Sequence, residues 1–113
     1  MQLRDEHGRV VCEDLTLADG PLTRMKGLLG RKGLPSGEGL LLRPAGSVHT
    51  WFMRFPIDAV FLDGEGRVLK IAADLRPWRA AGCRGAHAVL ELSSGESERR
   101  GVRPGDRLMP VEA

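Results

Sequence analysis

The 113-residue sequence predicts a mainly β fold, a small jelly-roll-like β-sandwich or partly open barrel with one or two short helices. Fifteen glycines and seven prolines interrupt the chain about every five residues, which favours short strands and loops over long helices. Between these breaks lie short apolar runs, several of them rich in β-branched residues, as strands are. The length suits one domain, so residues 1–113 are expected to form a single unit.

The expected elements follow in a simple order. A hairpin over residues 1–17 turns at Gly8, and Pro21 marks the start of a short helix that ends by Gly30. Further strands are expected over residues 39–44, 49–55, 57–63, 67–75 and 86–92, and a last strand ends at residue 111. A second helical turn is expected within residues 93–101, where Ser93 or Ser94 can cap it.

The segment HTWFMRFPIDAVFLD, residues 49–63, is the most distinctive part of the chain. Strand alternation would place His49, Trp51, Met53 and Phe55 on one face of its first half. Its second half is apolar on both faces, so it is expected to lie centrally between two layers. Asp58 is then an anomaly, because a carboxylate among apolar side chains is costly unless it is paired or hydrogen-bonded.

Two roles for Asp58 remain open. In the structural role it accepts backbone N–H groups beside Pro56, or pairs with an arginine such as Arg54, and fixes the bend between the two strands. In the functional role it orients His49 within a pocket. Buried polar groups most often serve structure, which favours the first role.

An aromatic cleft is the favoured binding site. Trp51, Met53 and Trp78 would form its apolar platform, which suits a sugar, a peptide or another flat ligand. The expected polar rim consists of His49, Arg54, Asp58 and Glu91.

Several function classes are disfavoured by the sequence. No HExxH, GxSxG, CxxC or paired-carboxylate spacing is present, so we expect no metal and no cofactor. The net charge is only +2 with interspersed signs, which argues against a nucleic-acid partner. No apolar run approaches the ~20 residues of a membrane span. Arg4, Asp5 and Glu6 occupy the place of a signal peptide's apolar stretch, so we expect a soluble cytoplasmic protein without a membrane partner.

Motifs along nearly the whole chain resemble those of the domain of unknown function 192 family. They are Arg24-x-x-Gly27-Leu28-Leu29-Gly30-Arg31, Gly39-Leu40-Leu41, HTWFMRFPIDAVFLD with Gly66 and Val68, Val89-Leu90-Glu91-Leu92 with Gly95, and Gly105-Asp106. The family more often has Met at the position of Leu29, and Lys-Asn or Lys-Thr at Arg54-Phe55, so ligand specificity here would differ if that position contacts a ligand. The resemblance implies a small jelly-roll β-sandwich with a short helix; many members carry export signals, and the activity is undefined.

Three functions follow as hypotheses. The favoured one is a non-catalytic module that binds a small ligand or a protein through the cleft around His49, Trp51 and Asp58. The alternative is a small hydrolase or isomerase that uses His49 oriented by Asp58. The third is weak nucleic-acid binding through the basic, glycine-rich loop of residues 24–32, which carries Arg24, Lys26, Arg31 and Lys32. The sequence names no ligand and no oligomeric state.

Overall fold

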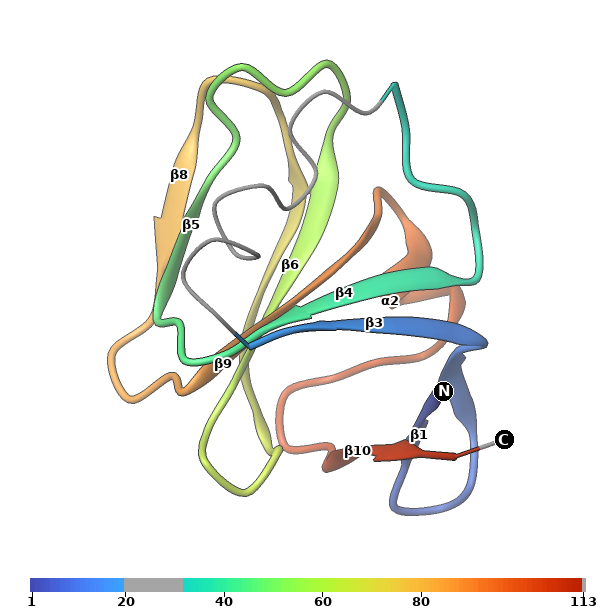
Figure 1. The fold of residues 1–113 in the computed structure, drawn as a ribbon. Helices are drawn as coiled ribbons and strands as arrows, with labels where there is room; N and C mark the ends of the chain where they lie inside the picture. The colour runs from blue at the N-terminus through green and yellow to red at the C-terminus, as the bar shows by residue number, and fades with distance from the viewer. Residues whose placement is uncertain (20–31, 113) are drawn as a thin grey trace.

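The computed structural model describes residues 1–19 and 32–112, and it is mainly β (Figure 1). A five-stranded sheet has the order β3-β4-β9-β6-β7, a three-stranded sheet the order β10-β1-β2, and β5 and β8 form a separate pair. The strands are β1 (Gln2–Asp5), β2 (Val10–Cys12), β3 (Asp14–Ala18), β4 (Glu38–Leu42), β5 (Ser47–His49), β6 (Ile57–Leu62), β7 (Val68–Leu75), β8 (Ala80–Gly82), β9 (Ala88–Ser93) and β10 (Leu108–Val111). The predicted mainly β fold is confirmed, and in the described part of the chain the sheets do not close into a barrel.

Strand β6 lies inside the five-stranded sheet, as its two apolar faces predicted. All six of its residues are buried, and it pairs antiparallel with β9 on one side and β7 on the other. Only β3 and β4 pair in parallel in this sheet.

Apolar cores cover both faces of the five-stranded sheet. On one face Val60 and Leu90 pack with Leu3 of β1 and Leu108 of β10. On the other face Phe61 packs with residues of the β5–β8 layer. Because side chains alternate along a strand, neighbouring residues of β6 and β9 enter different cores, and this alternation decides which polar side chains can meet.

The strand expected over residues 49–55 is wrong. Strand β5 ends at His49, and the chain then turns through Thr50 to Met53. The helix expected between Pro21 and Gly30 lies outside the described residues. The later helical turn is confirmed as α2 (Glu96–Arg99), which is the only α-helix in the described ranges.

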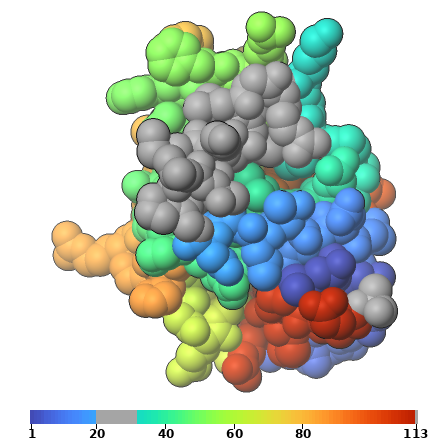
Figure 2. Space-filling view, viewed as in Figure 1, coloured from blue at the N-terminus to red at the C-terminus, as the bar shows by residue number. Residues whose placement is uncertain are grey.

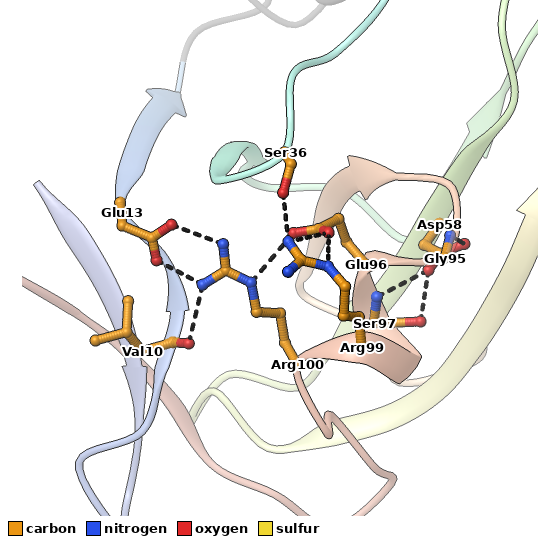
Figure 3. Close-up of polar contacts among 9 residues, drawn as sticks. All are labelled: Val10, Glu13, Ser36, Asp58, Gly95, Glu96, Ser97, Arg99 and Arg100. Carbon is orange, nitrogen blue, oxygen red and sulfur yellow. Dashed lines mark hydrogen bonds and ion pairs between the residues drawn. The ribbon is translucent and has the colours of Figure 1, made fainter.

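Ion pairs and hydrogen bonds attach α2 and the following Arg100 to Asp58 of β6 and to Glu13 between β2 and β3 (Figure 3). The guanidinium of Arg100, next to the helix, contacts both carboxylate oxygens of Glu13 at 2.5 and 2.6 Å and Glu96 at 3.2 Å. Arg99 also binds Glu96 and reaches Ser36. The hydrogen-bonded guanidinium of Arg100 holds the pKa of Glu13 below its usual range. These contacts hold the segment after β9 in place and are structural.

Candidate functional site

Buried Thr50 joins two turns that are distant in the sequence. Its backbone N–H donates to the carbonyl oxygen of Arg79 at 2.8 Å, and its carbonyl oxygen accepts the N–H groups of Met53 and Trp78. Its hydroxyl accepts the N–H of Arg79 at 2.9 Å and donates to the carbonyl oxygen of Arg76 at 2.5 Å. The side chain is completely buried. The turn at residues 50–53 and the turn at residues 76–79 are therefore held as one unit.

Each of these turns carries a bulky residue in the left-handed region. Phe52 and Trp78 both have φ of 66°, and each is the third residue of its turn. Type II turns favour Gly or Asn at this position because a Cβ atom is strained there. Such strain costs about 1–3 kcal/mol per residue and persists only where the surrounding structure enforces it. Thr50 supplies that enforcement through hydrogen bonds on both turns.

The aromatic side chains of the two turns project into solvent. Trp51 is 49% exposed, Phe52 70% and Trp78 57%. The rings of Phe52 and Trp78 meet edge to face at 4.8 Å, and the His49 and Trp51 rings lie 4.9 Å apart. We call residues 49–54 and 76–79 the aromatic tip. The β5–β6 and β7–β8 connections lie at the end of the molecule away from both termini (Figure 1), and the green atoms of the β5–β6 connection form its upper edge in Figure 2.

The charges of the aromatic tip all have one sign. It contains Arg54, Arg76 and Arg79 but no Asp or Glu. Arg76 lies 3.6 Å from Asp74 just outside the tip, and both side chains are largely exposed, so this pair is weak. No carboxylate of the described residues forms an ion pair with Arg54 or Arg79. The tip is therefore apolar and cationic in a protein that is close to neutral.

Asp58 lies in the core and is fully engaged by structural donors. Its Oδ1 accepts the backbone N–H groups of Asp74 at 2.9 Å and Gly95 at 3.2 Å. Its Oδ2 accepts the N–H of Ser97 at 2.9 Å and the hydroxyl of Ser97 at 2.6 Å. The structural role is thus the observed one, although the donors come from the end of β7, from Gly95 after β9 and from Ser97 in α2, and not from Arg54 or the bend at Pro56. The hypothesis that Asp58 orients His49 is wrong, because no donor on Asp58 belongs to His49.

Glu91 lies on the other face of the same sheet. It is directly opposite Leu40 of β4 and Ala59 of β6, which belong to two different apolar clusters of that face. Its side chain is buried, and its Oε2 has no hydrogen-bond partner among the described residues. Burial raises the pKa of Glu91 from its ordinary 4.5 to about 7. Glu91 and Asp58 therefore lie on opposite faces of the sheet and cannot both line one cleft. The polar rim that the sequence predicted from these two residues is wrong.

Of the expected site residues, the structure brings together His49 with Trp51, and places Trp78 and Arg54 on the same aromatic tip. Met53, expected in the platform, is buried in the core instead. The sequence did not identify Phe52 or Thr50 as part of a site. For the turn at residues 76–79 the available signal was Pro77 before Trp78, since Pro is common at the second position of a β-turn.

Comparison with known proteins shows which family this fold and these motifs define. A family model described as "Uncharacterized ACR", DUF192, matches residues 2–110. The chain belongs to the DUF192 family. A UPF0127 protein of Pyrococcus furiosus is 34% identical over 107 residues, which are 89% of this chain and 90% of that protein. The family resemblance seen in the sequence is thus confirmed.

Two crystal structures are similar to this DUF192 protein. One is a protein of unknown function from Novosphingobium aromaticivorans, with a TM-score of 0.82 and 27% identity, covering 96% of this chain and 82% of that one. The other is a Sinorhizobium meliloti protein described as a "putative transcription regulator", with a TM-score of 0.82 and 28% identity, covering 96% and 89%.

Two further features are absent from the described residues. Within residues 1–19 and 32–112 no helix has the length and apolar character of a membrane span. The same ranges contain no cluster of three or more His, Cys, Asp or Glu side chains arranged to hold a metal ion.

Proposed function

We propose that this DUF192 protein is a non-catalytic binding module whose contact surface is the aromatic tip. The observation that carries the proposal is the pair of exposed aromatic residues, Phe52 and Trp78, held in left-handed turns that favour glycine. Glycine would be less strained and would expose less apolar surface, so stability alone does not account for these side chains. Strain and exposed aromatic rings that coincide at one place are typical of binding sites.

The buried support of the tip favours the same function. Thr50 fixes the backbone of both turns, so the rings are presented without the ordering cost that a mobile loop would incur on binding. Trp, Phe and Arg at the tip are also residue types that contribute strongly to binding surfaces.

The enzyme alternative loses its main support. It required the Asp58 carboxylate within reach of His49 in an open pocket, whereas all four hydrogen bonds of that carboxylate come from Asp74, Gly95 and Ser97. The third hypothesis rests on residues 24–32, of which all but Lys32 lie outside the described residues.

The test uses the fluorescence of Trp51 and Trp78, which are the only tryptophans of the chain and both lie on the tip. We would titrate the protein with a panel of sugars, nucleotides and 12-residue peptides. Binding at the tip should change the emission and should be lost in Phe52→Ala. The matched control is Met109→Ala on β10, which removes an exposed apolar side chain far from the tip and should bind as the wild type does.

A compound that raises the melting temperature without changing tryptophan emission, and that binds Phe52→Ala as tightly as the wild type, would place the binding surface elsewhere. The proposal would also fail if no member of the panel distinguished the wild type from Phe52→Ala.

A further inference from the structure

We infer that the partner of the aromatic tip is a protein, and that it docks an acidic segment containing apolar side chains. This inference rests on the proposed function and adds the chemistry of the ligand. It follows from the charge of the tip, from its residue composition and from the small size of the charged patch.

The charge of the tip selects an anionic partner. Arg54, Arg76 and Arg79 belong to the same two segments as the exposed rings, and of these three only Arg76 has a carboxylate of the described residues within ion-pair distance, the exposed Asp74. An acidic segment would supply the counter-charges, and Arg can bind a carboxylate through two parallel hydrogen bonds. Charge complementarity of this kind raises association rates and excludes basic partners.

The composition of the tip matches the centre of a protein interface. Such centres are rich in aromatic residues and Arg and poor in Lys, Glu and Asp. The tip contains Trp51, Phe52 and Trp78 together with three arginines, and it has no Lys, Glu or Asp. Residues that dominate binding energy, Trp and Arg above all, are therefore concentrated on two short turns.

The size of the cationic patch favours a short segment over a long polyanion. The whole chain carries 17 basic and 15 acidic residues, so a nucleic acid that extends beyond the tip would meet carboxylates as often as cations. A peptide that covers only the tip meets the three arginines and the rings, and Asp74 at the edge of the tip offsets the charge of Arg76 only. Single-stranded nucleic acid remains the competing occupant, because bases also stack on exposed aromatic rings.

The experiment is a selection of random 12-residue peptides on the immobilised full chain, followed by titration of the best peptides using tryptophan emission. Selected peptides should be enriched in Asp and Glu beside apolar residues. Arg54→Glu should weaken the best peptide about tenfold at low salt, since it replaces an attraction by a repulsion. The matched control is Arg103→Glu, which makes the same charge change beside Val68 at the start of β7. The tip residues 76–79 follow the other end of β7, so Arg103→Glu should not change the affinity for the peptide.

The outcomes separate the two proposals. If the selected peptides are neutral and Arg54→Glu binds them as Arg103→Glu does, the acidic partner is excluded while the binding module stands. If a 12-nucleotide oligo-dT binds the tip more tightly than any selected peptide, the partner is nucleic acid and the inference is wrong. If the double variant Phe52→Ala/Trp78→Ala yields the same peptides with the same affinity, the tip is not the binding surface and both proposals fail.

Discussion

The hydroxyl of Thr50 accepts the backbone N–H of Arg79 at 2.9 Å. In an ordinary β-turn over residues 76–79 this N–H would donate to the carbonyl oxygen of Arg76. The same oxygen donates its proton to the carbonyl oxygen of Arg76, at the other end of that turn. Residue 50 thus completes a turn that begins 26 positions later. Because this oxygen is buried, water cannot replace it, and the shape of the aromatic tip depends on one side chain.

The first prediction concerns this hydroxyl. Thr50→Val keeps the shape of the side chain but leaves the N–H of Arg79 and the carbonyl of Arg76 without a partner. Leaving buried polar groups unsatisfied should lower the free energy of unfolding by roughly 1–3 kcal/mol. Urea denaturation, with the midpoint compared at unchanged m-value, measures this loss.

Thr16→Val is the control for Thr50→Val, because Thr16 is exposed on β3 and should change stability by no more than about 0.5 kcal/mol. Thr50→Val should also reduce any binding that Phe52→Ala abolishes, since the turns lose their common support. Equal stability of the Thr50 and Thr16 variants would mean that the hydroxyl does not hold the turns.

The second prediction isolates the backbone strain of Phe52. Phe52→Ala and Phe52→Gly both remove the ring, but only Gly relieves the left-handed φ of 66°. Phe52→Gly should therefore be more stable than Phe52→Ala by about 1 kcal/mol, although Gly normally costs stability relative to Ala. Both variants should lose tip binding equally. If Ala is the more stable of the two, as at an ordinary position, the turn is not strained.

The third prediction separates Asp58 from the binding surface. Asp58→Asn replaces one carboxylate oxygen by an amide donor that faces the donors of Ser97 or of Asp74 and Gly95. Stability should fall by roughly 2–4 kcal/mol, since a buried charge-assisted network is broken. Asp14→Asn, exposed on β3, is the control. Below its melting temperature the Asp58 variant should bind tip ligands as the wild type does; a variant of normal stability that fails to bind would give Asp58 a functional role.

The sequence predicted strands correctly where the pattern was local, as in an apolar run that is buried on both faces. The apolar run over residues 57–63 and its partner over residues 67–75 correspond to β6 and β7, because burial of both faces and a glycine turn are visible in the residues themselves. The run over residues 49–55 looked equally strand-like. It turns instead, because Thr50 forms its hydrogen bonds with residues 76–79, and no local pattern reveals such a long-range contact.

The residues of the candidate site were also predicted only in part. The sequence identified Trp51, Trp78, His49 and Arg54 by their chemistry, but it grouped Asp58 and Glu91 with them. Asp58 and Glu91 face opposite cores because alternation on β6 and β9 is set by the register of the sheet, in which Glu91 is paired with Ala59 and not with Asp58. Phe52 could not be recognised as exposed, because its left-handed turn is imposed by tertiary contacts.

The fourth prediction uses the buried carboxyl of Glu91. Because burial raises the pKa of Glu91 from 4.5 to about 7, the folded protein holds this proton between these pH values while the unfolded chain has already released it. The contribution of Glu91 to stability is therefore fully present below about pH 4.5, falls as the pH rises towards 7, and is lost above that. Across this window the loss amounts to at most about 3 kcal/mol.

Glu91→Gln cannot ionise, so it should match the wild type near pH 4 and be more stable at pH 8. Urea midpoints of the wild type and Glu91→Gln at pH 4, 6 and 8 measure the difference in stability between them. The other carboxylates are the same in both proteins, so their titration does not contribute to this difference. A constant difference at all three pH values would show that Glu91 is ionised in the folded protein at neutral pH, and that a group near its Oε2 stabilises the charge.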